Sequence, residues 1–186
     1  MQLILASASA RRAELLTSAG FTFVVAPADV DESVQPGEEP ARYALRVARD
    51  KASARAASGA DVAVLAADTV VVVDGQILGK PRDRDDARRM LEALSGRVHE
   101  VLTAVVLRDG GGAEQTEVAT TRVHVAVLAE ADVASYLASG EWEGKAGGYG
   151  IQGHAARYIE RIEGSWSNVV GLPISTVHRL MNGLRR

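Results

Sequence analysis

The chain alternates short apolar runs, which predict strands, with longer segments of helical periodicity. Val62–Ala67 is entirely apolar and predicts a strand that is buried on both faces. Val70–Val73 and Gln76–Leu78 flank the pair Asp74-Gly75, which is the pattern of a hairpin with a tight turn. Further strands are predicted at Leu3–Ala6, Phe21–Ala26, His99–Arg108, Glu117–Leu128 and Arg157–Ile162.

Helices are predicted where apolar positions recur every three or four residues between capping signals. Ser9 is expected to cap a helix that runs to about Ser18 and ends at Gly20. Ala41–Ser58 is a long segment rich in alanine and arginine, closed by Gly59. The remaining predicted helices are Arg84–Leu94, Ala131–Ser139 and Pro173–Leu184.

The order of these elements predicts one α/β domain over residues 1–186, built around a mixed sheet. The predicted strand Glu117–Leu128 alternates well, with Arg122, His124 and Ala126 on one face and Val123, Val125 and Val127 on the other. The sequence contains no internal repeat and no low-complexity segment.

Composition narrows the possible functions. Apolar residues make up 47% of the chain, which excludes disorder as its main state, and the net charge of −3 gives no general attraction for nucleic acid or membranes. Aromatic residues make up only 4%, too few for an extended base-stacking surface. The absence of cysteine rules out disulfides and thiol chemistry. Without a signal-peptide pattern or a membrane-length apolar run, we expect a cytoplasmic protein.

The first candidate site follows the first predicted strand, where Ser7 and Ser9 precede Arg11 and Arg12. A helix start offers unpaired N–H groups, and arginine adds forked donors that match phosphate oxygens. The segment lacks the glycine-rich pattern of a Walker loop. A serine-capped helix with two solvated arginines is an equally good interpretation of these residues alone.

Carboxylates form the second candidate site. Asp68 follows the buried strand Val62–Ala67, and open α/β sheets place ligand-binding groups at such strand ends. Burial there tunes a carboxylate toward work as a general base, although an aspartate that caps a turn has the same pattern. Asp29, Asp31 and Glu32 lie in a polar loop and suit Mg²⁺ or Mn²⁺, or are simply solvated.

Two further segments carry candidate binding groups. Lys80 lies between Gly79 and Pro81, so a constrained backbone holds its ammonium, which suits phosphate or is merely solvated. The segment Lys145–Gly153 is rich in glycine and contains Gln152, whose amide both donates and accepts hydrogen bonds. Tyr149 and Ile151 indicate that this loop packs against the core. The spacing of the histidines does not support a zinc site.

Taken together, these segments resemble the Maf family of nucleotide pyrophosphatases. The matching motifs run in the family order over nearly the whole chain, and together they are specific. They lie at Leu5–Leu16, Ala67–Thr69, Gly79–Pro81, Leu94–His99, Lys145–Gly153 and Val169–Pro173. Ala10 departs from the family, which usually has proline there, and we expect a slightly looser turn around the phosphates.

The resemblance implies a two-lobed mixed-sheet fold of the inosine triphosphatase-like (Maf/Ham1) type with a central cleft, and a homodimer. It implies hydrolysis of a nucleoside triphosphate to the monophosphate and pyrophosphate, in a house-cleaning role. Asp68 would then be the catalytic base, and Mg²⁺ or Mn²⁺ would be held by Glu32 and Asp68. Asp68 cannot easily be both a tight metal ligand and the base, and the sequence leaves open which of the two roles dominates. The phosphate-binding residues would be Ser7, Arg11, Arg12, Lys51 and Lys80.

Three positions distinguish the substrate types of the family. Arg11, Thr69 and Gln152 match the set of the dTTP/UTP type, whereas Trp, Gln and Glu mark the 7-methyl-GTP type. We hypothesise that the Gln152 amide accepts from N3–H and donates to O4 of a uracil or thymine. Changing Gln152 to glutamate would then raise the KM for UTP.

Two other functions compete with this one. The first is a nucleotide-binding regulator of cell division with little turnover, since the family has long carried a septum-formation label. Such a regulator needs no base at Asp68, so the presence of Asp68 favours the enzyme. The second is a nucleic-acid-binding module, which the net charge and the few aromatic residues disfavour.

Overall fold

A computed structural model describes residues 2–55 and 61–184, and the chain divides into two compact units. The first unit comprises Met1–Thr69, Thr103–Ala119 and Gly171–Arg186, and the second comprises Val70–Leu102 and Thr120–Val170. The expectation of a single domain over residues 1–186 stays a prediction.

The described strands form a seven-stranded mixed sheet with the order β2-β1-β3-β5-β6-β7, in which β4 pairs with β3. Parallel pairing joins β1 to both β2 and β3, whereas β3–β4 and β6–β7 are antiparallel. This confirms the predicted α/β class with a mixed sheet. The strands are β1 (Gln2–Leu5), β2 (Phe23–Val25), β3 (Val62–Val73), β4 (Gln76–Leu78), β5 (Val98–Asp109), β6 (Glu114–Val125) and β7 (Ile159–Glu163).

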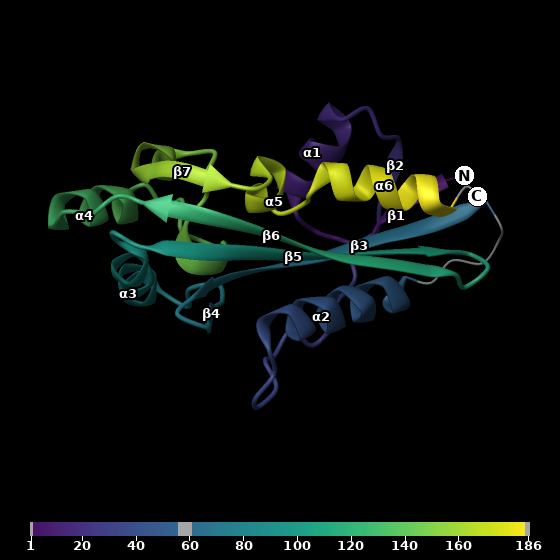
Figure 1. The fold of residues 1–186 in the computed structure, drawn as a ribbon, viewed down its shortest axis with the longest axis horizontal. Coiled ribbons are helices and arrows are strands. Elements are labelled where there is room, and N and C mark those ends of the chain that lie inside the picture. Colours follow the sequence, from purple (N-terminus) through teal and green to yellow (C-terminus); the bar gives the residue numbers. More distant parts are fainter. Residues whose placement is uncertain (1, 56–60, 185–186) are drawn as a thin grey trace. The chain divides into compact units, whose positions relative to one another are not determined.

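In the first unit, helices cover both faces of the sheet. Helix α2 (Pro40–Ala54) lies on one face, and α1 (Ala10–Ser18) and α6 (Ile174–Leu184) lie on the other (Figure 1). This explains why residues 3–5 of β1 and the first half of β3 are apolar, because helices cover both faces of the sheet there. The buried core of this unit consists of Leu3, Leu5, Leu16, Ala63, Leu65, Ala67, Val105, Leu107, Leu172, Val177, Leu180 and Met181.

The second unit has a core of its own, to which α3 (Arg84–Leu94) and α4 (Glu130–Ala138) contribute. Helix α3 contacts α4 and the short 3-10 turn η1 (Ala146–Gly148). A second 3-10 turn, η2 (His154–Tyr158), leads into β7, and a short helix, α5 (Trp166–Val170), follows it. The core residues include Val71, Val73, Leu78, Ala87, Met90, Leu91, Leu94, Val101, Val123, Val133, Tyr136, Leu137 and Tyr149.

Local sequence signals predicted several elements correctly. The hairpin of β3 and β4 turns at Asp74-Gly75, where both residues have positive φ angles of 50° and 77°, as a two-residue hairpin turn requires. Helix α3 has the predicted bounds, and the Asp83 side chain caps it by accepting from the backbone N–H of Asp86 at 2.7 Å. Helix α5 was not predicted, because five residues are too few to show a helical period.

The main correction concerns β3. The prediction of two separate strands, Val62–Ala67 and Val70–Val73, was wrong, because β3 continues without interruption through Asp68 and Thr69. Asp68 therefore lies within a long strand and not at its end. The parallel pairing with β1 nevertheless stops at Leu65, three residues before Asp68, so this carboxylate lies beyond the carboxyl end of β1.

Several element boundaries also differ by a few residues from the predicted ones. Helix α2 spans Pro40–Ala54, and the predicted end at Ser58 and stop at Gly59 both lie outside the described residues. Strand β6 ends at Val125, so Val127 lies beyond the strand and is 83% exposed, whereas Val123 and Val125 are buried. The alternation of apolar and polar residues in the sequence therefore continues for one repeat beyond the end of the strand.

Candidate functional site

The site in the first unit begins at the turn between β1 and α1. Ser7 is buried, and its hydroxyl oxygen accepts from the backbone N–H of Ser9 at 3.2 Å and from Arg12 Nη1 at 3.1 Å. Ser9 occupies the N-cap position of α1, but its side chain makes no capping hydrogen bond, so the predicted serine cap was wrong. Ser7 organises this turn instead.

Arg12 connects three segments that are far apart in the sequence. Besides Ser7, its guanidinium donates from Nε to the carbonyl of Gly171 at 2.8 Å and from Nη2 to Thr69 Oγ1 at 3.0 Å. Burial lowers the pKa of Arg12, and the nearby Asp68 opposes this shift. Three of its five donors are thus used on protein groups. Its role in binding phosphate stays a prediction. Arg11, which precedes it on α1, is half-buried, and its role in binding phosphate also stays a prediction.

The hydroxyl of Thr69 takes part in the same hydrogen-bond network. It lies 2.9 Å from the hydroxyl of Thr103 on β5 and donates to the carbonyl of Gly171 at 3.2 Å. Neither Thr103 nor the carbonyl of Gly171 was predicted as a site group. No local pattern marks Thr103 as a site residue, whereas Gly171 lies within the motif Val169–Pro173.

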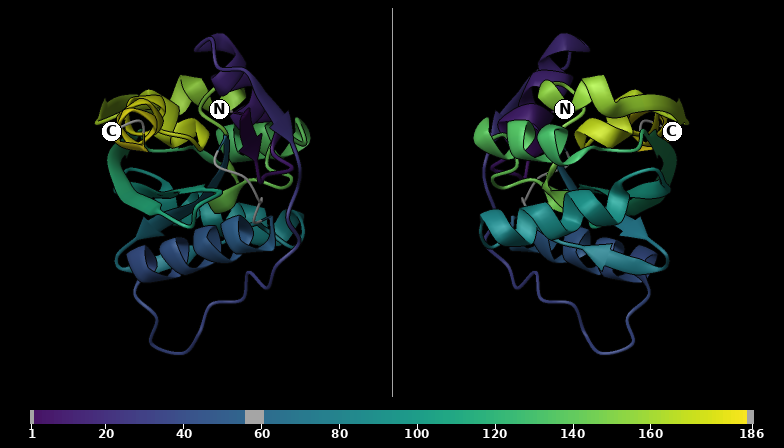
Figure 2. Two further views of the ribbon diagram at one scale, coloured as in Figure 1. Left: turned by 90° about the vertical axis from the view of Figure 1, so that its right-hand side faces the viewer. Right: turned by 90° about the vertical axis from the view of Figure 1, so that its left-hand side faces the viewer.

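The central feature of the site is a lysine held between two carboxylates. Lys51 Nζ lies 2.8 Å from Asp68 Oδ1 and 2.7 Å from Glu32 Oε1. Lys51 and Asp68 are each 7% exposed, whereas Glu32 is more open to solvent. The three charged groups come from α2, from β3 and from the loop that connects β2 to α2. Figure 2 shows the backbone of this long loop where it leads into the blue helix α2. The fold therefore brings together two carboxylates and one ammonium that are well separated in the sequence.

Two opposing effects act on the pKa of Asp68. Burial penalises the charged carboxylate and raises this pKa, while Lys51 and Arg12 lower it through their positive charges. Burial has the larger effect, so the pKa of Asp68 lies above its ordinary value. A carboxylate with a raised pKa is a better proton acceptor, which suits a general base.

The loop that carries Glu32 is fixed by side chains of α2. Tyr43 donates from its hydroxyl to the Glu32 carbonyl at 2.8 Å, and burial raises the pKa of Tyr43 to about 12. Arg46 donates to the Ser33 carbonyl at 2.9 Å. Sequence reasoning missed Tyr43, although a single tyrosine in a helix of alanine and arginine was a usable signal.

The other two acidic residues of this loop have different surroundings. Asp31 accepts from the backbone N–H of Ser33 at 2.8 Å, which lowers the pKa of Asp31. Asp29 is exposed. Among the described residues, no group of three or more acidic, histidine or cysteine side chains is arranged to hold a metal ion. Glu32 and Asp68 remain the two carboxylates that approach one common cation, Lys51.

The second unit contains the other predicted binding residues. Lys80 is exposed and follows β4, and Gln152 is exposed in the glycine-rich loop. These two segments are connected, because the backbone N–H of Gly147 donates to the carbonyl of Gly79 at 3.0 Å. The loop is packed, as predicted, since Tyr149 is buried and Ile151 is half-buried against the core of this unit.

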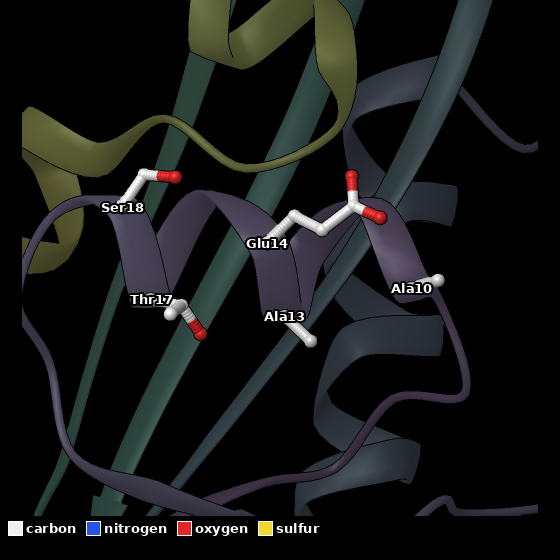
Figure 3. Close-up of a pocket in the computed structure, with 5 residues that line it drawn as sticks. All are labelled: Ala10, Ala13, Glu14, Thr17 and Ser18. Carbon is white, nitrogen blue, oxygen red and sulfur yellow. The ribbon is translucent and has the colours of Figure 1, made fainter.

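A hollow on the outer side of α1 has a volume of about 400 Å³ (Figure 3). Glu14 is the one charged side chain among its lining residues, which are Ala10, Ala13, Glu14, Thr17 and Ser18. None of the predicted site residues lines this hollow. The described helices also include none that is long and apolar enough to cross a bilayer.

Comparison with known proteins gives a family match over almost the entire chain. A family profile described as "Maf-like protein" matches residues 2–184. The chain is 52% identical over 183 residues to the dTTP/UTP pyrophosphatase of Anaeromyxobacter dehalogenans strain 2CP-1, covering 97% of this chain and 92% of that protein. It is 51% identical over 181 residues to the dTTP/UTP pyrophosphatase of Koribacter versatilis, covering 97% and 93%.

Solved structures match over a smaller part of the chain. The Ham1 protein of Staphylococcus aureus has a TM-score of 0.47 at 14% identity, covering 68% of this chain and 72% of that one. The nucleoside-triphosphatase / dITP/XTP pyrophosphatase of Mycobacterium abscessus has a TM-score of 0.42 at 17% identity, covering 69% and 76%.

Proposed function

Because the chain belongs to the Maf family, we propose that it is a pyrophosphatase that hydrolyses dTTP and UTP to the nucleoside monophosphate and pyrophosphate. The observation that carries this proposal is the buried Asp68 carboxylate held by Lys51 and flanked by Glu32. Burial raises the pKa of this carboxylate, which suits a general base and supports an enzyme over a protein that only binds nucleotides. House-cleaning of non-standard pyrimidine triphosphates is the proposed biological role.

In the proposed reaction, Asp68 orients a water molecule and accepts its proton as the water attacks the α-phosphorus. The bond between the α-phosphorus and the bridging oxygen breaks, and pyrophosphate leaves with the bonding electrons. Burial supports this role, since it raises the pKa of Asp68 and makes the carboxylate a stronger base. Lys51 fixes the orientation of this carboxylate through its contact with Oδ1.

The remaining residues are proposed to bind and orient the substrate. Ser7, Arg11 and Lys80 bind phosphate oxygens, and Gln152 recognises the pyrimidine base. Arg12 and Lys51 complete the phosphate-binding set proposed from sequence, and both also bond protein groups. With Arg11 and Gln152, Thr69 forms the set that favours dTTP and UTP over 7-methyl-GTP.

The donor set fits a divalent cation. Glu32 and Asp68 both reach one positive group, the Lys51 ammonium, so both carboxylates can reach a common cation. Mg²⁺ and Mn²⁺ prefer oxygen ligands and are typically held by one or two carboxylates together with substrate phosphates. When bound, such an ion would neutralise charge on the triphosphate and on the departing pyrophosphate.

The proposal is tested by measuring pyrophosphate release from dTTP, UTP, CTP, GTP and 7-methyl-GTP with Mg²⁺ or Mn²⁺. The wild type should favour dTTP and UTP. Asp68→Asn should lower kcat roughly 10²- to 10⁴-fold, the usual contribution of a general base. Asp86→Asn is the matched control, because Asp86 is also 7% exposed but lies on α3 and bonds Arg82 and Arg89.

The control should keep the wild-type kcat. Undiminished turnover by Asp68→Asn would refute Asp68 as the base. Nucleotide binding without any turnover by the wild type would instead favour the regulator of cell division. Preference for 7-methyl-GTP would contradict the assigned substrate type.

A further inference from the structure

Gln152 lies on a loop that is anchored on both sides. The loop spans residues 145–154 in the second unit, and Gln152 is exposed, whereas the nearby Tyr149 is buried. An exposed glutamine next to glycines has many accessible positions unless its backbone is held. A residue that selects a base needs a fixed position, so the anchors of this loop determine how well Gln152 can discriminate.

The most buried anchor is the pair Tyr149 and His99. The Tyr149 hydroxyl lies 2.7 Å from His99 Nε2, and the two rings meet edge to face with centroids 5.3 Å apart. His99 is 1% exposed and Tyr149 is 8% exposed. The pair joins β5 to the loop across 50 residues of sequence. It therefore fixes the loop to the sheet three residues before Gln152.

Burial of the His99 ring destabilises the folded state, because one of its nitrogens is unpaired in the part of the chain that the structure describes. Its Nδ1 atom is buried and has no hydrogen-bond partner among the described residues. Burial also lowers the pKa of His99 to about 4, so the ring is neutral near pH 7. An apolar side chain would avoid the cost of this unpaired nitrogen. What histidine supplies here, and an apolar residue cannot, is the hydrogen bond to Tyr149.

Two other contacts hold the loop close to Gln152. The backbone N–H of Gly150 donates to the Tyr136 hydroxyl at 3.2 Å, and the backbone N–H of His154 donates to Glu141 Oε2 at 2.9 Å. Together with the Tyr149–His99 bond, these contacts restrain the chain on both sides of Gln152. The exposed amide is thus presented from a backbone that cannot shift freely.

We propose that Tyr149 and His99 are positioning residues that act through Gln152 to set recognition of the pyrimidine base. This inference rests on the proposed function and extends it to two buried residues, which act through the loop that carries Gln152. Loss of the Tyr149–His99 bond loosens the loop and weakens base binding, while the hydrolytic step at the phosphates is unchanged. The expected signature is therefore a change in KM and not in kcat.

The test is a double-mutant cycle with Tyr149→Phe and Gln152→Glu. Tyr149→Phe removes one hydroxyl and should raise the KM for UTP about two- to ten-fold, the effect of one hydrogen bond, with kcat unchanged. In the Gln152→Glu background, Tyr149→Phe should change KM less than two-fold, because the residue through which it acts is already altered.

Tyr158→Phe is the matched control. The Tyr158 hydroxyl donates to the Asp132 carbonyl at 3.2 Å in the same unit and not to the loop. This variant should lower the thermal unfolding temperature as Tyr149→Phe does, but leave KM unchanged. Equal KM effects of both variants, or additive effects of Tyr149→Phe and Gln152→Glu, would overturn the inference.

Hydrogen exchange separates this inference from the proposed function. Amides of residues 146–154 should exchange faster in Tyr149→Phe than in the wild type or Tyr158→Phe, whether or not the protein turns over UTP. If the wild type fails to hydrolyse UTP, the proposed function falls, and the dissociation constant for UTP then replaces KM in the cycle. Unchanged exchange in Tyr149→Phe would overturn the inference even in an active enzyme.

Discussion

Buried charged and polar side chains of this protein are positioned mainly by one another. Arg12 uses three donors to connect Ser7, Thr69 and the carbonyl of Gly171, and Lys51 bonds both Glu32 and Asp68. Ser7, Arg12, Lys51 and Asp68 therefore each have a compensating partner in the folded chain, as buried polar groups require. A positively charged side chain such as Arg12 or Lys51 can therefore contribute to phosphate hydrolysis by orienting neighbouring groups, even if it does not itself bind a phosphate.

At this scale, His99 predicts a pH dependence of stability. The unfolded chain protonates His99 near pH 6.5 and the folded chain only near pH 4, so the unfolded state binds more protons between these values. The contribution of neutral His99 to the free energy of unfolding is complete above pH 6.5 and is lost as the pH falls toward 4. The loss amounts to roughly 3 kcal/mol at 1.36 kcal/mol per pKa unit.

Urea unfolding of the wild type and His99→Gln between pH 4.5 and 7 measures this effect. The free energy of unfolding should fall less steeply with decreasing pH in His99→Gln than in the wild type. His178→Gln, which changes an exposed histidine of α6, should keep the wild-type slope. Parallel curves for His99→Gln and the wild type would exclude His99 as the source.

At the scale of elements, the glycine-rich loop shows how a backbone conformation depends on packing. Gly147 has a φ angle of 69°, and a Cβ atom built there would lie 2.9 Å from the Val71 side chain on β3. Its N–H also donates to the Gly79 carbonyl beside Lys80. Only glycine satisfies both the left-handed conformation and the close approach to β3. The loop and the end of β4 are thereby held together.

Gly147→Ala should therefore destabilise the protein for two separable reasons. The left-handed conformation costs about 1–2 kcal/mol for alanine, and the contact with Val71 adds about 1–3 kcal/mol. Gly140→Ala isolates the first cost, because Gly140 has a φ angle of 71° and nothing within 4 Å of an added Cβ atom. Thermal or urea unfolding should show a larger loss for Gly147→Ala, and equal losses would contradict the packing argument.

At the scale of the whole molecule, the small net charge gives no general attraction for a triphosphate, and each of the two units has an apolar core of its own. The net charge is −3, so attraction for a triphosphate must come from a few positive side chains and helix termini. Each unit buries an apolar cluster of its own, and β3, β5 and β6 contribute residues to both units. Stability is thus distributed along the chain and does not depend on the candidate site alone.

Ligand binding should stabilise the folded chain in a metal-dependent way. A non-hydrolysable UTP analogue at 100 times its dissociation constant should add about 2.7 kcal/mol to the free energy of unfolding in the presence of Mg²⁺. For a chain of this length, this corresponds to an increase in Tm of roughly 5–10 °C. Removing the divalent ion with EDTA should abolish most of this shift and the release of pyrophosphate from UTP.

Adding excess Mn²⁺ should restore both effects. The corresponding cytidine analogue at the same concentration is the control, and its shift should be smaller. An analogue-induced shift that is identical with and without EDTA would contradict a metal held by Glu32, Asp68 and the triphosphate.

The sequence by itself determined the fold class and most elements, because their signals are local. The Asp74-Gly75 turn, the capped helix α3 and the apolar run of β3 each depend on neighbours a few residues away. The sequence also provided the candidate site residues and, through the resemblance, the family. Their roles in catalysis and binding stay predictions.

Only the tertiary structure decided which of these residues meet. Asp68 contacts Lys51 across 17 residues, Arg12 contacts Gly171 across 159, and Tyr149 contacts His99 across 50. Such pairs form when packed elements bring distant segments together, and no local pattern encodes them. The same reason explains why Asp68 lies inside β3 and not at its end: strand length follows from pairing and burial on the sheet, which are properties of the folded chain.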